Sequence, residues 1–361
     1  MSLQTLPLPA THPPRSLRWN RWRKGLFGSP LNIAVTVAVL GLFAWAVPPL
    51  IRWTLLDATW SGTPEDCAQR SGACWAFIGV KLRFITFGFY PPPVQWRSFT
   101  ALILLGGLVI ASAIPRFWRP PLLIAWIAVP AAAIVLLSGL FSGGHVSTEQ
   151  WGGLTLTLLV SVTGFAGAFP IAVLLALGRR SRLGGIRLLC VAFIETVRGV
   201  PLVAVLYVAT LLVPMMLPEG ITLDKLLRAQ IGIIVFISAY LAEIVRAGLQ
   251  ALPSGQTEAA ASLGLTAWQT QRLVTLPQAL KAVIPAIVNL LIGLVQNTPL
   301  VAVIGIFDLL NAARKATDDT AWLGFYNEAY VFSALVYFAL CFTASRYSLW
   351  LERWVKRSDR H

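Results

Sequence analysis

The stretch 253–277 reads PSGQTEAAASLGLTAWQTQRLVTLP, and the rest of the chain is organised around it. It is the longest polar interruption in the apolar second half, and a run long enough to cross a membrane lies on each side. Ser254 and Thr257 are residue types that cap helix starts, so the sequence predicts a short helix over 256–263. Gly264 can adopt the left-handed conformation that ends such a helix.

A second helix is predicted directly after this glycine. Thr266 and Gln269 have the spacing of a capping box, and Pro277 is expected to break or kink the helix that they start. The first helix carries three consecutive alanines, at 259–261, whose small side chains let another surface approach closely. Two short helices with a small-residue surface, held at a membrane face, predict a docking element.

Composition places the chain in a membrane. Hydrophobic residues make up 57% of it and charged residues 12%, whereas about a quarter of an ordinary soluble domain is charged. The formal charge of +14 invites a nucleic-acid partner, but the basic residues fall in short clusters between apolar runs rather than on one soluble face. The predicted fold class is therefore an all-α integral membrane protein that binds no nucleic acid.

The apolar runs predict about eight transmembrane helices, which places both termini on the same side of the membrane. A cleaved signal peptide is an alternative for the first run, because Ala44 and Ala46 have the spacing of a cleavage site. The length of that run and the orientation that the later helices need favour a span. The predicted spans are residues 31–51, 98–115, 121–141, 152–177, 189–213, 230–249, 283–306 and 329–345.

Charge sets the predicted orientation. Basic residues gather in the tail 1–30, after the second and fourth spans, around 253–277 and in the tail 351–361. Because short loops rich in Lys and Arg stay in the cytoplasm, both tails and the stretch 253–277 are predicted to be cytoplasmic. In the first tail, Arg15, Arg18 and Arg21 alternate with tryptophans, which is typical of an anchor at the membrane surface.

The cysteines divide according to this topology. Cys67 and Cys74 lie in the polar loop 52–97, which is predicted to face a compartment that permits disulfides, so we expect them to pair. A metal site is not expected there, because no histidine or second cysteine pair lies nearby. Cys190 and Cys341 are interpreted as ordinary small apolar residues.

Further motifs surround the central stretch: ETVRGVP at 195–201, AYLAEIVR at 239–246, QNTPL at 296–300 and IFDLL at 306–310. With them, 253–277 resembles the EAA loop of ABC-transporter permeases, in which only Val274 replaces the usual isoleucine. The motifs are similar to those of the polar amino-acid branch, the importers of His, Glu, Gln, Arg or L-amino acids generally. The resemblance covers 151–350. Before it, GACWAFI at 72–78 resembles the outer loop of the long general L-amino-acid permeases.

The resemblance implies a domain plan and a set of partners. Residues 151–350 would form the five-helix core of a type I importer, and 31–150 an extension with three spans. The partners would be a second permease, for which the long extension favours a dissimilar chain, an ATPase dimer that binds ATP and Mg, and a periplasmic amino-acid-binding protein. The binding protein would meet the outer segments 52–97, 214–227 and 307–328, and the location would be the bacterial inner membrane.

The energy for transport is expected to come from another chain. The sequence contains no G-x-x-x-x-G-K-[ST], so this subunit is predicted to be no enzyme and to hold no cofactor. The resemblance implies that the EAA loop docks into the ATPase and passes its closure to the spans. The implied docking residues are Gln256, Glu258, Ala259, Ala260, Gly264, Leu265 and Pro277.

Charged residues within spans are costly and usually face a cavity or a partner. Glu195 and Arg198 lie three apart and could neutralise one another, while Pro201 weakens the helix and could expose backbone to a cavity. Glu243 and Arg246 have the same spacing near the inner end of the sixth predicted span. Both pairs are candidates for helix pairing or for gating, and the first also for the substrate path.

Gln296, Asn297 and Thr298 form a polar knot in the seventh predicted span. Such residues can bond across helices or hold a substrate at a helix break. The family usually reads KDTSL here, so Gln296 and Pro299 replace a charged residue and a serine. This departure is compatible with a site that accepts several amino acids and with a subunit that binds none.

Two other classes of function stay open at this point. A secondary transporter predicts inverted repeats and paired carboxylates at the membrane midplane, and the sequence has neither. A membrane scaffold would need the docking loop but not the polar residues within the spans.

Overall fold

The structure is a computed structural model that describes residues 23–140, 144–218 and 220–358. These residues form helices and no named strand, and they divide into two compact units, Met1–Ala76 and Phe77–His361. Seven of the described helices are long and apolar enough to cross a membrane, or eight if one bent pair counts as a span. The all-α transmembrane prediction is confirmed. Arg15, Arg18 and Arg21 of the predicted anchor lie outside the described residues.

The first unit contains the helix α2, Pro30–Ile51. It starts where the Ser29 hydroxyl accepts a hydrogen bond from the Asn32 backbone N–H at 3.2 Å, and it continues into a π-helical turn, Arg52–Leu56. No residue of α2 is buried, so its apolar side chains are available to lipid on every face. Its length agrees with the predicted first span.

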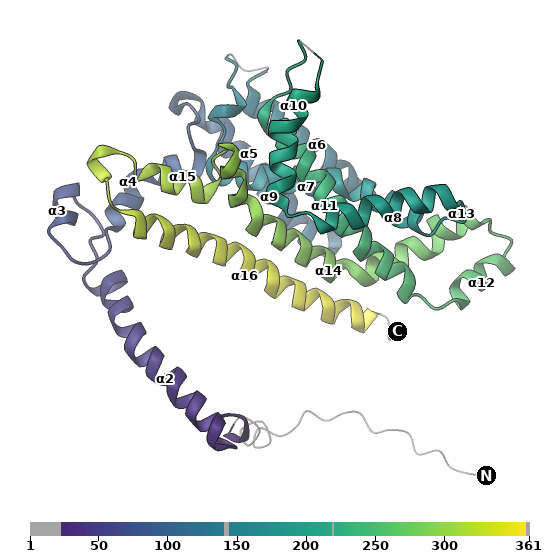
Figure 1. Ribbon diagram of the computed structural model, residues 1–361, viewed down its shortest axis with the longest axis horizontal. Helices are drawn as coiled ribbons and strands as arrows, with labels where there is room; N and C mark the ends of the chain where they lie inside the picture. Colours follow the sequence, from purple (N-terminus) through teal and green to yellow (C-terminus); the bar gives the residue numbers. More distant parts are fainter. Residues whose placement is uncertain (1–22, 141–143, 219, 359–361) are drawn as a thin grey trace. The chain divides into compact units, whose positions relative to one another are not determined.

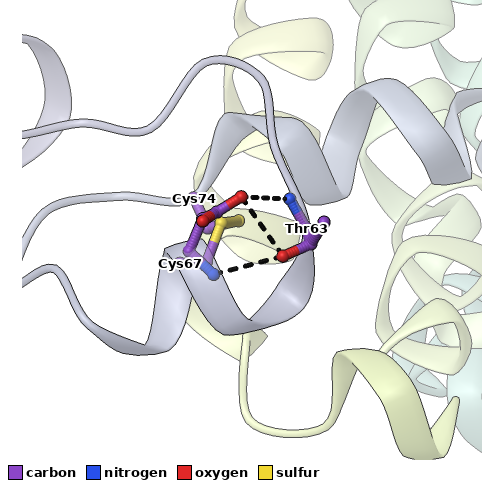
Figure 2. Close-up of a disulfide and its surroundings, with 4 residues drawn as sticks. Thr63, Cys67 and Cys74 are labelled. Atoms are coloured by element: carbon purple, nitrogen blue, oxygen red, sulfur yellow. Dashed lines mark hydrogen bonds between the residues drawn. A yellow bond between two sulfur atoms is a disulfide. The ribbon is translucent and has the colours of Figure 1, made fainter.

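A disulfide joins Cys67 and Cys74 in the same unit (Figure 2). Cys67 belongs to the short helix α3, Pro64–Ala68, which begins at a capping box formed by Thr63 and Asp66. Two hydrogen bonds from Thr63 lower the pKa of the Asp66 carboxyl, and the bond from the Thr63 backbone N–H has the larger effect. The Asp66 side chain is therefore a carboxylate at neutral pH. The disulfide links two cysteines seven residues apart, next to a helix start that the capping box already stabilises.

Replacing Cys74 with serine is expected to loosen this loop. A disulfide stabilises chiefly by restricting the unfolded chain, and for a loop this short the contribution is about 2 kcal/mol. Arg70 is exposed inside the loop, so trypsin should cleave after it faster in Cys74→Ser than in the native chain. Cys190→Ser, which alters a free thiol, is the control and should leave the cleavage rate unchanged. Equal rates in all three proteins would contradict the stabilising role.

The second unit begins within α4, Trp75–Phe87. This helix lies inside 52–97, so the segment that the sequence predicted as a loop is partly helical. One face of α4, with Phe77 and Ile85, is fully buried, and this packing stabilises the helix. The helices α5, Gln95–Ala113, and α6, Pro120–Ser138, follow and correspond to the second and third predicted spans.

Four further candidate spans and one bent pair of helices follow in the second unit (Figure 1). The helices α7 and α11 form its centre, and they approach closely because Gly164 and Gly167 face Ile233 and Ile234 with no side chain of their own. The remaining spans pack around this pair. The bounds are α7 Gly153–Arg179, α8 Gly184–Gly199 with α9 Leu202–Tyr207, α11 Lys225–Ala251, α14 Leu276–Asn297 and α16 Tyr326–Ser358.

The fifth predicted span is not one continuous helix. It breaks between α8 and α9, and the segments on either side meet at a bend of 105°. Pro201 lies at this break as the N-cap of α9, where its missing N–H costs no helical hydrogen bond. The break thus occurs where the sequence predicted a weakened helix, and it leaves backbone groups near Val200 outside regular helix.

Pro277 does not end its helix, so the predicted break is wrong, while the alternative of a kink stays a prediction. The short helix α13, Ala267–Thr270, passes through a π-helical turn, Gln271–Thr275, directly into α14. A π-helical turn shifts the hydrogen-bond register, so the N–H that proline lacks is not needed there. The segment Ala267–Ile304 is consequently long enough to count as a single span.

Candidate functional site

The stretch 253–277 forms a helical hairpin at the opposite end of the second unit from α15, Leu309–Ala316 (Figure 1). Its first helix, α12, spans Gly255–Ser262, and Gly264 follows with a φ of +78°. The Thr266 hydroxyl then accepts a hydrogen bond from the Gln269 N–H, and the Gln269 side chain accepts one from the Thr266 N–H. The left-handed glycine and the capping box are both confirmed.

The surface of this hairpin is largely free of contacts with the rest of the unit. Leu263 is 81% exposed and Trp268 is 63% exposed, although both are large apolar side chains. The hairpin is tied to the base of α14 by a hydrogen bond from the Gln278 amide to the Gln256 amide oxygen at 3.1 Å. An exposed leucine and tryptophan on a short, fixed hairpin are typical of a surface that another protein covers.

Most of the predicted docking residues lie on that surface, with one correction. Glu258, Ala259 and Gly264 are exposed, and so are Gln256 and Pro277, whereas Leu265 is half-buried. Ala260 is buried, so its methyl group packs within the hairpin and cannot meet a partner. The small-residue face is therefore formed by its two alanine neighbours, because successive helical residues point in different directions.

Five charged side chains meet where α7, α8 and α11 come together. Glu243 of α11 lies at the centre, with Arg179 at 3.3 Å, Arg198 at 4.0 Å and the Arg246 Nε at 2.8 Å. Glu195 completes the group by pairing with Arg179 at 2.8 Å. The cluster has three positive charges against two negative ones.

The predicted pairing of Glu195 with Arg198 is wrong. Both residues lie on α8, but each finds its partner on a different helix, Arg179 on α7 and Glu243 on α11. Arg198 also lies over the ring of Tyr240 at 5.6 Å, and the Tyr240 hydroxyl donates to the Arg198 carbonyl at 3.2 Å. These contacts connect the bend between α8 and α9 to α11, whereas an ion pair within α8 would connect it to no other helix.

Removing the central carboxylate should destabilise this cluster more than removing the peripheral one. Glu243→Ala leaves Arg246 partly buried without its carboxylate partner and removes one of the two partners of Arg179, at a cost of about 2 kcal/mol. Glu195→Ala should cost less than about 1 kcal/mol, because the Glu195 side chain is 54% exposed and that of Glu243 only 24%. Thermal unfolding of both variants in detergent measures the difference. Equal losses would show that Glu243 is not the centre of the cluster.

The three residues of the polar knot, at the end of α14, do not share one environment. Gln296 and Asn297 are exposed, while Thr298 is buried at the start of a 3-10 helix, Thr298–Ile304. Gln296 lines a groove of about 500 Å³ between α14 and α16, together with Asn289, Pro299 and Tyr337. The groove carries amide and hydroxyl groups and no ionisable carboxylate or amine among its lining residues.

Thr298 instead joins a buried network around Asp308. The Tyr337 hydroxyl donates to the Asp308 carboxylate at 2.6 Å, and Thr298 bonds to both of them at 3.4 and 2.9 Å. The other carboxylate oxygen accepts from the Asn311 backbone N–H at 3.0 Å and so caps α15. Thr157 of α7 accepts from the Leu309 N–H at 3.0 Å. One buried carboxylate thus connects α15 with α16 and with the end of α14.

Comparison with known proteins shows which family shares this arrangement. The family described as the inner membrane component of binding-protein-dependent transport systems matches residues 168–357, which include the hairpin, the charged cluster and the Asp308 network. The chain belongs to this family. The permease is 46% identical over 355 residues to the inner membrane amino-acid ABC transporter permease protein YhdY of Escherichia coli (strain K12), covering 96% of the chain and 95% of that protein.

Two further relatives define how much of the permease is shared. It is 37% identical to the glutamate/glutamine/aspartate/asparagine transport system permease protein BztC of Rhodobacter capsulatus, with 96% of the chain and 95% of that protein covered. A crystal structure of an amino acid ABC transporter with histidines is 32% identical, with a TM-score of 0.50, over 56% of the chain and 91% of that structure's chain. The extension 31–150 and the residues up to 167 lie outside the family match.

Sequence reasoning missed two residues of the permease that organise these sites. Arg179 was visible only as one of a basic run after the fourth span, and nothing local marks it as the partner of Glu195. Asp308 has a local signal, because aspartate is a preferred N-cap residue and the helix Leu309–Ala316 follows it directly. Its bonds to Thr298 and Tyr337 come from distant segments and have no such signal.

Proposed function

We propose that this permease is the transmembrane subunit of an ATP-driven importer of amino acids. The permeases YhdY and BztC, which it matches over nearly its whole length, are named as amino-acid transport proteins. In this proposal both termini and the hairpin 253–277 are cytoplasmic, as the basic segments predict. A second homologous permease completes the pathway, and a periplasmic binding protein delivers the amino acid.

The exposed hairpin is the observation that supports coupling to a separate ATPase. In an ATP-driven importer the energy would enter from another chain, since this sequence has no phosphate-binding loop, and that chain would hold the ATP and Mg. The hairpin offers Leu263 and Trp268 to such a partner and continues through Ala267–Ile304 into a span. A push on the hairpin would therefore reach the spans as rigid-body motion rather than being lost in a flexible loop.

Two regions are proposed to line the substrate path. One is the bend between α8 and α9, with Glu195, Arg198 and Pro201, and the Glu243–Arg246 pair beside it as a gate. The other is the end of α14, where Gln296 faces the groove, Asn297 is exposed and Thr298 is bonded to Asp308. Because the groove presents amides and hydroxyls, it would contact the amino acid through hydrogen bonds rather than through a fixed charge.

Purification with native partners, followed by ATPase assays in proteoliposomes, tests this proposal. The expected result is that a two-ATPase, two-permease assembly is recovered, and that binding protein loaded with certain amino acids stimulates its ATPase. Uptake should then fall in Gln296→Ala and in Glu195→Ala. A membrane scaffold would retain the partners but tolerate both substitutions, and an ion-coupled carrier would transport without any ATPase.

A further inference from the structure

The helix α4 packs against the segment 307–328 that joins the end of α14 to α16. At one end of the contact, the buried Phe77 ring lies 5.9 Å from Trp322 and 6.0 Å from Phe325. One turn further along, the Lys81 ammonium pairs with the Asp319 carboxylate. Phe77 and Lys81, which hold the segment 307–328 through these contacts, thus come from a helix outside the family match.

The far end of α4 is held by close backbone contacts. Gly153 has a φ of +66°, and a Cβ added to it would lie 2.4 Å from the Thr86 carbonyl carbon and oxygen. Its N–H donates to the Phe307 carbonyl at 2.9 Å, and the Phe307 ring meets Phe89 at 5.3 Å. The end of α4, the start of α7 and the start of 307–328 therefore meet with no room for a side chain at Gly153.

The ion pair is more than an ordinary surface contact. The Lys81 side chain is only 19% exposed, so the loss of Asp319 would leave an ammonium largely out of water without this counter-charge. The bond from Lys81 is the main cause that lowers the pKa of the Asp319 carboxyl, so this carboxylate stays ionised to a lower pH than a free aspartate. Geometry and charge both fix Lys81 against this segment.

A displacement of 307–328 would reach the spans directly. The second residue of the segment is Asp308, whose carboxylate bonds to Thr298 at the end of α14 and to Tyr337 of α16. Tyr337 also lines the groove between these two helices. The position of the segment is therefore linked to the region proposed to contact the amino acid.

We propose that α4 is a brace that sets the position of the segment 307–328 for the binding protein, with Lys81 and Asp319 as positioning residues. The brace rests on the proposed function, in which the binding protein docks on this segment. A docking surface held in its bound geometry loses less conformational entropy when its partner arrives, so the brace lowers the concentration of binding protein that uptake requires.

Charge exchange between the two positions tests the brace. In proteoliposomes with all partners present, Lys81→Asp and Asp319→Lys should each raise the binding-protein concentration for half-maximal uptake by about fivefold. The double variant should recover most of the native value, since it restores an opposite-charge pair.

A measurement that needs no transport separates the brace from the proposed function. Thr317 is fully buried at the end of α15, so Thr317→Cys should react slowly with a membrane-impermeant maleimide. Adding Lys81→Asp or Asp319→Lys should each speed this labelling, and combining the two substitutions should slow it again. Lys315→Asp, which reverses an exposed lysine paired with Asp318 on the same segment, is the matched control and should not change the rate.

The outcomes are distinct. Unchanged labelling in both single reversals overturns the brace, whatever the transport assay gives. Faster labelling with an unchanged binding-protein requirement overturns its role in docking. Labelling that follows the charge pairing in a protein that transports no amino acid supports the brace and contradicts the proposed function.

Discussion

Replacing Gly264 with valine is expected to abolish coupled uptake while the chain still inserts into the membrane. Gly264 has a φ of +78°, where a residue with a Cβ costs about 1–2 kcal/mol and a β-branched one is a rarer outlier still. The chain turns here between α12 and α13, so relief of the strain must reorient one helix against the other. Because this hairpin is the proposed docking surface, we expect uptake to fall by at least about tenfold.

The matched control is the same substitution at Gly255. This glycine lies at the start of α12 in the same hairpin, has no positive φ, and has nothing within 4 Å of an added Cβ. Gly255→Val should therefore keep uptake within about twofold of native. Uptake and ATPase stimulation are measured on the same vesicles, with membrane levels checked by immunoblot. Native coupling in Gly264→Val would contradict the view that the geometry of the hairpin carries the coupling.

Features set by neighbouring residues could be predicted from the sequence. The turn at Gly264 and the capping box of Thr266 and Gln269 depend on backbone conformation and on hydrogen bonds three residues apart. The break near Pro201 is of the same kind, because a proline acts on its own helix. Pro277 shows the limit of this reasoning, since a π-helical turn over the residues before it absorbs the defect without ending the helix.

Features set by the packing of distant helices could not be predicted. The i, i+3 spacing of Glu195 and Arg198 allows a pair, but the sequence does not say that Arg179 of α7 and Glu243 of α11 compete for them. The burial of Ala260 likewise depends on how α12 packs against the second half of the hairpin. Spacing restricts which contacts are possible, and tertiary packing selects among them.

Loss of the Asp308 carboxylate is expected to be the most destabilising single change predicted here. The residue is 1% exposed and accepts bonds from Tyr337, Asn311 and Thr298. Asp308→Ala removes the N-cap of α15 and leaves buried hydroxyl and N–H groups without an acceptor, which together cost about 3 kcal/mol. For a domain of this size, the melting temperature in detergent should fall by roughly 10 °C.

Two milder variants separate the parts of this effect. Tyr337→Phe removes one hydrogen bond and keeps the ring, so it should cost about 1 kcal/mol. Asp308→Asn keeps an oxygen for the Asn311 N–H and so retains the cap, and it should fall between the other two variants. If instead Asp308→Asn is as unstable as Asp308→Ala, the charge of the carboxylate matters more than its hydrogen bonds. If all three variants melt like the native permease, the network does not hold α15 to α16, and a displacement of 307–328 would have no buried connection to the spans.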